Sequence, residues 1–191
     1  MKTCLKMLLN PALLVFVLGT VTASGQVPSA FEANKWTIIA TLHAEGAQVY
    51  ECKPDTSKSP TQAHTLTWQF REPIATLIVG GQSIGRHYAG PNWDHIDGSG
   101  VKGRVIASMP AATSNDIPWL ELEVVDHRNI GILSNATTVQ RVNTRGGVAK
   151  GSCESAGSYL SVPYSADYVF SARADDAGAA PAVGANRELH P

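Results

Sequence analysis

The chain has 191 residues, 43% of them hydrophobic and 16% charged, which is sufficient for one packed core and small for two full domains. Its 15 Lys and Arg residues nearly balance 16 Asp and Glu residues, so it lacks the basic surface that nucleic-acid binding normally requires. With 17 Gly and 11 Pro residues the chain is rich in turns, but it stays below the range of collagen-like or disordered chains.

The first 23 residues have the layout of a secretory signal peptide. Two lysines precede an apolar stretch at residues 7–18, and small residues lead up to Ala23, after which we expect cleavage. A helix that spans a bilayer needs about 20 apolar residues, whereas this stretch is shorter and contains Asn10 and Pro11. We therefore expect a secreted protein, in the periplasm, at the cell surface or outside the cell, without a membrane span in the mature chain.

The cysteines agree with export. Cys4 lies within the signal peptide, which leaves Cys52 and Cys153 as the thiols of the mature chain. An oxidising compartment would pair them in one disulfide bond, which would close a loop of about 100 residues and stabilise the fold by at most about 4.7 kcal/mol. The alternative is two separate, buried free cysteines.

From Trp36 onward, apolar residues recur with a period of two, which is typical of strands that bury one face. The alternation is clearest at residues 65–70, 119–124 and 164–170. In chain order, the pattern predicts strands at residues 36–42, 48–52, 65–70, 75–79, 101–108, 119–124, 130–133, 137–143 and 164–170. No stretch after the signal peptide has the spacing of an amphipathic helix.

Glycine-rich segments between the predicted strands indicate turns at residues 44–46, 80–81, 97–100 and 145–147. We therefore expect an all-β fold, a single-domain sandwich or partly closed barrel of about nine short strands with one disulfide. This β domain is expected at residues 35–171, after a loose segment at residues 24–34. Residues 172–191, mostly Ala, Gly and Pro with scattered charges, are expected to be a disordered tail.

Two short motifs match catalytic or cofactor-binding patterns without the structural context that these patterns need. Residues 81–85 match G-x-S-x-G around Ser83, but the residues that follow cannot begin a helix, so we interpret the motif as a hairpin turn. Residues 98–103 match G-x-G-x-x-G, but no strand leads in and no helix follows. We therefore predict no catalytic residue and no cofactor from these motifs.

Residues 87–100 combine imidazoles, carboxylates, an amide and two large aromatic side chains in what we expect to be one long connection. The predicted ligand-binding residues are His87, Tyr88, Asn92, Trp93 and Asp97. The two aromatic side chains would stack on an apolar face of a glycan or another small molecule, while the amide and the carboxylate would bond its hydroxyl groups. The spacing of histidines and carboxylates matches no zinc or calcium motif, so no metal site is predicted.

Two other interpretations of this segment remain open. In an enzyme, His87 would act as a general base or metal ligand, and Asp97 would orient it or coordinate beside it. In a purely structural envelope protein, Trp93 would fill the core, His87 would bond to the backbone, and Asp97 would cap a turn.

Charged side chains on the predicted strands have simpler interpretations. Glu121 and Glu123 share one strand face, which we expect to be solvated. Arg141 lies in a predicted strand, where we expect it to be half-buried and paired with a carboxylate such as that of Asp167.

A further series of motifs runs in order from Ala47 to Phe170. It comprises Gln48-Val49-Tyr50-Glu51-Cys52, Trp68-x-Phe70 with Pro73, Gly85-x-His87-Tyr88-Ala89-Gly90-Pro91-x-Trp93, Asp97-Gly98-Ser99, Ile117-Pro118-Trp119-Leu120, Gln140-Arg141-Val142-Asn143-Thr144-x-Gly146-Gly147, Cys153 and Val162-Pro163-Tyr164-x-Ala166-x-Tyr168-x-Phe170. This series resembles the secreted bacterial and fungal proteins of the DUF3455 family. The resemblance implies export and a single β-rich domain, and it implies no activity or cofactor. Ser83 and His95 fall outside the motifs, which weakens a serine-hydrolase or two-histidine metal site.

Overall fold

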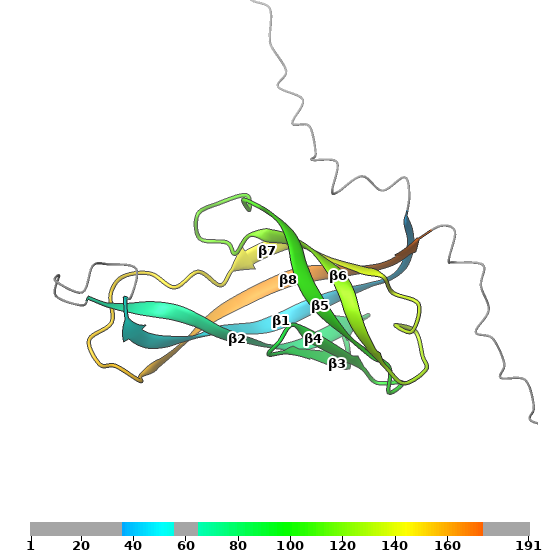
Figure 1. Cartoon of the computed structure of the whole chain (residues 1–191), viewed down its shortest axis with the longest axis horizontal. Coiled ribbons are helices and arrows are strands. Elements are labelled where there is room, and N and C mark those ends of the chain that lie inside the picture. Colours follow the sequence, from blue (N-terminus) through cyan, green and yellow to red (C-terminus); the bar gives the residue numbers. More distant parts are fainter. Residues whose placement is uncertain (1–35, 56–64, 174–191) are drawn as a thin grey trace, which may run out of the picture.

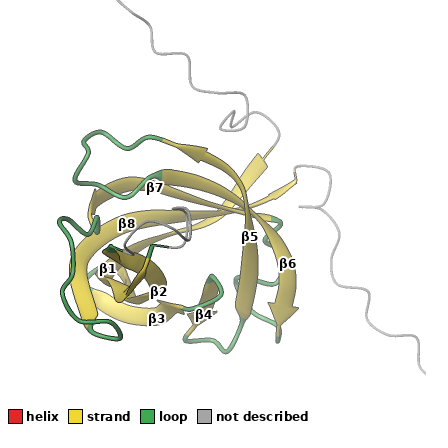
Figure 2. Ribbon diagram, turned by 60° about the vertical axis from the view of Figure 1, so that its left-hand side comes forward, coloured by secondary structure: helices red, strands yellow, loops and turns green. Residues whose placement is uncertain are grey.

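The computed structural model describes residues 36–55 and 65–173, which form one closed antiparallel barrel (Figure 1). The strands follow one another in chain order around the barrel, and β8 closes it by pairing with β1 (Figure 2). They are β1 (Trp36–Pro54), β2 (Leu66–Val79), β3 (Gln82–Tyr88), β4 (Asn92–His95), β5 (Gly100–Met109), β6 (Trp119–Arg128), β7 (Thr138–Gly146) and β8 (Tyr159–Arg173). The all-β prediction is confirmed, with eight strands where about nine were expected and with full closure.

Two predicted strand breaks are absent. The turn expected at residues 44–46 lies within β1, which pairs continuously with β2 through this region. Gly46 is needed there for close approach, because a Cβ atom would lie only 2.0 Å from the carbonyl oxygen of Ile74. The strands predicted at residues 65–70 and 75–79 are likewise one strand, β2.

The prediction of a strand at residues 130–133 is wrong. These residues form bends and a turn between β6 and β7. Side chains hold their backbone in place: Ser134 accepts a hydrogen bond from the Gly131 amide, and Asp97 accepts one from the Ile132 amide. The apolar run thus reflects a turn that buries Leu133, rather than a paired strand.

The core fills the inside of the barrel, because inward-facing residues alternate with outward-facing ones along each strand. On β8, Tyr164, Ala166, Tyr168 and Phe170 are all buried and face inward. The largest fully buried side chains are Trp93, Tyr168, Phe170, Leu77, Leu122 and Leu133.

The barrel wall is uneven because β3 and β4 are short. β3 pairs with β2 only at residues 75–79, and β4 pairs with β5 only at residues 100–102. The first half of β2 and the second half of β5 therefore extend past the β3–β4 turn without a strand between them. The turn itself contacts β5, since the Gly103 amide donates to the carbonyl oxygen of Pro91 over 2.9 Å.

The predicted disulfide between Cys52 and Cys153 is present, with Cα atoms 5.9 Å apart. It attaches the segment before β8 to the end of β1. Backbone hydrogen bonds reinforce this attachment, because Cys52 donates to Ser158 and accepts from Gly157.

Several predicted segments lie outside the described residues: the signal peptide, the loose segment at residues 24–34 and the tail from residue 174 onward. β8 continues through Arg173, two residues into the expected tail. No helix in the described part of the chain has the length and apolar character needed to cross a membrane.

Candidate functional site

The segment predicted as one long connection is a short hairpin. His87 and Tyr88 end β3, and β4 begins at Asn92. His87 pairs directly with Trp93 across the two strands, so both side chains lie on the same face of the sheet. That face is the barrel interior, where His87 is 3% and Trp93 1% exposed. Tyr88 lies on the opposite, outer face.

His87 is held as a neutral imidazole in the interior. Its Nδ1 lies 2.8 Å from the carbonyl oxygen of Asn92, which can only accept, so Nδ1 carries the proton and Nε2 carries the lone pair. Burial lowers the pKa of His87 to about 3, against the opposing effect of this hydrogen bond, and the charge of Arg141 adds to the lowering. His87 is therefore a hydrogen-bond acceptor at neutral pH.

Aromatic rings surround the imidazole. The Trp93 indole stacks on it with ring centroids 4.6 Å apart and 9° between the planes. The Tyr168 ring lies 4.8 Å from the imidazole and 5.3 Å from the indole. The indole Nε1 is buried, and it has no hydrogen-bond partner among the described residues.

Arg141 completes this group from β7, where it lies directly opposite Tyr168 of β8. Its Nε and Nη2 donate to the carbonyl oxygen of Pro118 at 3.1 and 2.8 Å. Burial raises the pKa of Tyr168 well above its ordinary value, although the nearby charge of Arg141 opposes this shift. Tyr168 is therefore a neutral phenol, with its oxygen 3.3 Å from that of Tyr164.

These side chains border a cavity of about 210 Å³, which we call the barrel cavity. It lies where the wall between β2 and β5 lacks a strand. Phe70 and Val105 form part of its rim and are 55% and 48% exposed, whereas His87, Trp93 and Tyr168 are buried. The lining consists of Phe70, Arg71, Pro73, His87, Gly90, Pro91, Trp93, Val105, Leu120, Leu122, Arg141 and Tyr168.

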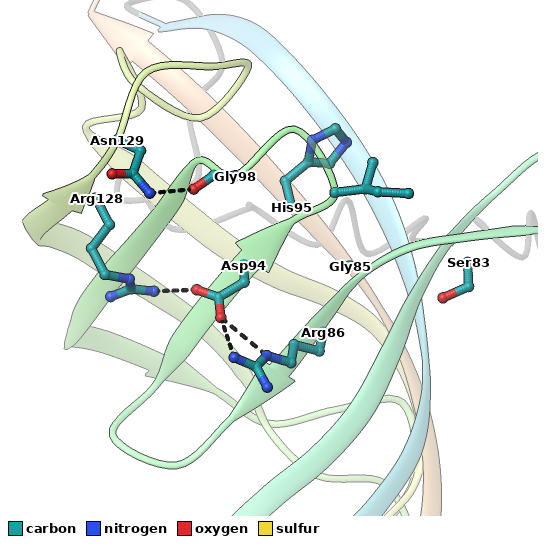
Figure 3. A pocket seen from close by; sticks show the side chains of 9 residues that line it. Ser83, Gly85, Arg86, Asp94, His95, Gly98, Arg128 and Asn129 are labelled. Carbon is teal, nitrogen blue, oxygen red and sulfur yellow. Dashed lines mark hydrogen bonds and ion pairs between the residues drawn. The ribbon is translucent and has the colours of Figure 1, made fainter.

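A second, shallower depression of about 540 Å³ lies on the outer face of β3 and β4 and is here called the outer pocket (Figure 3). Asp94 stands at its centre and accepts hydrogen bonds from Arg86 on one oxygen and from Arg128 on the other. Partial burial would raise the pKa of Asp94, but the hydrogen bonds from Arg128, Arg86 and Tyr88 lower it. The charges in this pocket therefore largely satisfy one another.

The side chains of Asn92 and Asp97 form hydrogen bonds within the protein that hold neighbouring turns. The Asn92 side chain donates to the carbonyl oxygen of Ala89 in the turn and accepts from Arg128. Asp97 accepts from the amide and hydroxyl of Ser99 and from the amide of Ile132. These hydrogen bonds hold the turn after β4.

The structure thus divides the five predicted residues among different places. His87 and Trp93 line the barrel cavity, whereas Tyr88 and Asn92 lie beside the outer-pocket network and Asp97 lies in a turn. His87 and Asp97, the pair required by the enzyme interpretation, do not line the same cavity. Among the described residues, no three His, Cys, Asp or Glu side chains gather into a possible metal site.

Two expectations about charged residues are wrong. Glu121 is not solvated: it is 5% exposed, and one carboxylate oxygen is without a hydrogen-bond partner in the described part of the chain. Arg141 does not pair with Asp167, which instead bonds to His43 and Asn143. Because side chains alternate along β8, Tyr168 faces inward and Asp167 faces outward.

Arg141 and Tyr168 line the barrel cavity but are not among the residues predicted to bind a ligand. Both residues lie at positions whose side chains face the barrel interior, on the neighbouring strands β7 and β8. A charged residue such as Arg141 at an inward-facing position is the signal that could have revealed the cavity.

Comparison with known proteins gives one family. Residues 78–172 match the family described as "Protein of unknown function (DUF3455)", and the chain resembles this family over that range. The matched range contains His87, Trp93, Arg141 and Tyr168. No curated protein and no solved structure matches the chain.

Proposed function

We propose that this protein binds a small ligand with a compact apolar body in the barrel cavity. The supporting observation is the cavity itself, about 210 Å³ in volume and lined by apolar side chains with a few converging polar groups, which is the usual composition of a small-molecule site. An apolar protein cavity of about 150 Å³ can hold benzene. The barrel cavity is therefore large enough for a single ring with a small polar substituent.

Two polar atoms in the lining favour a ligand that forms hydrogen bonds. The Trp93 indole N–H is buried without a partner among the described side chains, and leaving such a donor unpaired costs about 1–3 kcal/mol. Nε2 of His87 carries a lone pair, since Nδ1 already donates to the backbone. A ligand that presents an acceptor to Trp93 or a donor to His87 would satisfy these atoms.

The proposal places this activity outside the cytoplasm. The layout of residues 1–23 supports export. The disulfide between Cys52 and Cys153 is compatible with an oxidising compartment.

A glycan bound at the outer pocket is the second candidate. This depression is open and brings together charged and amide side chains, including Arg86, Asp94, Arg128 and Asn129 (Figure 3). Trp93 is too deeply buried to stack on a sugar, so Tyr88 would have to supply the aromatic contact.

The test uses the mature chain labelled with ¹⁵N-tryptophan. Toluene, phenol and benzyl alcohol are added at up to millimolar concentrations, and the indole N–H signal of Trp93, identified by its loss in Trp93→Phe, is followed by NMR. Val105→Phe should obstruct the rim of the cavity. Val125→Phe is the matched control, because Val125 is similarly exposed, at 49%, and does not line the cavity.

The proposal predicts that at least one compound shifts the Trp93 signal in a saturable way, with weaker binding to Val105→Phe and unchanged binding to Val125→Phe. A Trp93 signal that no compound moves, or equal binding by all three proteins, would contradict it. A wall oligosaccharide that binds the wild type and Val105→Phe equally, but not Tyr88→Ala, would favour the glycan site instead.

A further inference from the structure

The lining of the barrel cavity contains two arginines and neither Asp nor Glu. Arg71, near the rim, has its own partners: its Nε lies 3.2 Å from a carboxylate oxygen of Glu72, and its guanidinium lies 4.9 Å from the ring centroid of Tyr159. Arg141 forms no ion pair with any described residue. The cavity therefore has a positive charge that no acidic residue in its lining balances.

The guanidinium of Arg141 also has unused donors. It has five N–H groups, and the carbonyl oxygen of Pro118 accepts from two of them. The hydroxyl of Tyr168 can accept from one more. Two N–H groups of the guanidinium then remain, and an arginine can use such a pair to bind both oxygens of a carboxylate.

The charge of Arg141 affects three buried residues of the barrel interior. Burial is the main influence on the pKa values of His87, Tyr164 and Tyr168, and the charge of Arg141 lowers each of them. His87 belongs to β3, and the two tyrosines belong to β8. A partly buried cation without a counter-charge is unfavourable, and a bound anion would correct this.

We propose that Arg141 binds the carboxylate of a small monocarboxylic acid, whose apolar body contacts Leu120, Leu122 and Trp93. This inference rests on the proposed function and names its ligand class. The apolar walls exclude a highly hydrated anion such as inorganic phosphate, because they cannot replace its water. A compact aromatic or branched aliphatic acid fits both the volume and the charge.

The test compares benzoate with two neutral molecules of similar shape, benzamide and benzyl alcohol, by NMR titration of the mature protein. Arg141→Gln removes the charge from the cavity. Arg145→Gln is the matched control, because Arg145 lies on the same strand but is exposed and outside the cavity lining. Inorganic phosphate serves as a probe for simple attraction of anions.

We expect benzoate to bind the wild type and Arg145→Gln at least about tenfold more tightly than benzyl alcohol does, because hydrogen bonds between charged groups stabilise the bound carboxylate. Arg141→Gln should lose this preference while still binding benzyl alcohol, and phosphate should not displace benzoate. Equal affinities for benzoate and benzyl alcohol in the wild type would overturn the carboxylate assignment alone. Absence of binding by all three ring compounds would overturn the cavity proposal itself. The wild-type comparison decides the matter even where Arg141→Gln fails to fold.

Discussion

The imidazole of His87 lies flat against the indole of Trp93 inside the barrel, with the ring centroids 4.6 Å apart. The pairing of β3 with β4 brings these residues together, although five residues separate them in the chain. One consequence concerns stability in acid, because a proton added to His87 would place a charge between aromatic rings in a closed interior.

The first prediction is a loss of stability as the pH falls from 6.5 to about 3. The pKa of His87 falls from an ordinary value of 6.5 to about 3 on folding, so over this range the unfolded chain binds a proton that the folded chain does not. The free energy of unfolding should therefore fall by up to about 1.4 kcal/mol per pH unit as the pH decreases. Urea unfolding at several pH values measures it.

His87→Gln, which keeps a donor for the Asn92 carbonyl, should flatten this pH dependence. His127→Gln is the control, since His127 also bonds to a backbone carbonyl, that of Ala136, but its residue is exposed. An NMR titration in which the His87 ring protonates near pH 6.5 would contradict the prediction.

The second prediction concerns Glu121. Burial raises the pKa of its carboxyl, and one of its oxygens has no partner within the described residues. Its negative charge therefore costs stability at pH 7, and the cost disappears as the pH falls below the raised pKa. Glu121→Gln should increase the free energy of unfolding by about 1 kcal/mol at pH 7 and by less at pH 4.

Glu123→Gln is the comparison for Glu121→Gln, because Glu123 lies on the same strand and bonds to Arg104 at the surface. It should be neutral or slightly destabilising. Destabilisation by Glu121→Gln at pH 7 would mean that the charge of Glu121 has a stabilising partner.

The third prediction is that Asp97 acts in folding rather than in ligand binding. Asp97→Ala removes the three hydrogen bonds that the carboxylate accepts from the Ser99 amide, the Ser99 hydroxyl and the Ile132 amide. The free energy of unfolding should therefore fall by about 1–3 kcal/mol. Asp126→Ala, at an exposed position of β6, should change it by less than about 0.5 kcal/mol. Urea unfolding measures both. Weakened binding of a small aromatic ligand by folded Asp97→Ala, with unchanged stability, would support the original site prediction.

The fourth prediction concerns the disulfide, which joins positions 101 residues apart. The double variant Cys52→Ser/Cys153→Ser should unfold with a free energy about 2–5 kcal/mol lower than that of the oxidised wild type. The reduced wild type should match the double variant. Equal stability with and without reductant would show that the bond does not constrain the unfolded chain.

Strand content was predictable from the sequence because one-sided burial imposes a period of two on the side chains. The alternation at Tyr164, Ala166, Tyr168 and Phe170 defines an inner face that the structure contains. The disulfide was predictable because two thiols remain once Cys4 is assigned to the signal peptide. The break expected at Gly46 was not a turn, because glycine serves there to let β1 and β2 approach closely.

The barrel cavity was not predictable, because it depends on how far each strand is paired. Tyr88 and Trp93 look equivalent in the sequence, but the β3–β4 pairing places them on opposite faces of the sheet. Arg141 lines the cavity because it pairs with the inward-facing Tyr168 of β8, and no local sequence motif encodes this strand register. The sequence thus identified the correct segment for two lining residues and missed the strands that complete the site.

The most direct test of cavity binding is a crystal structure of the mature protein with 4-bromobenzoate, whose bromine is located by its anomalous signal. We expect a bromine peak inside the barrel, in contact with Leu122 and Trp93, and carboxylate oxygens within hydrogen-bonding distance of Arg141. A bromine peak only at the outer pocket beside Arg86 and Arg128, or no peak at a saturating concentration, would show that the barrel cavity does not bind this acid.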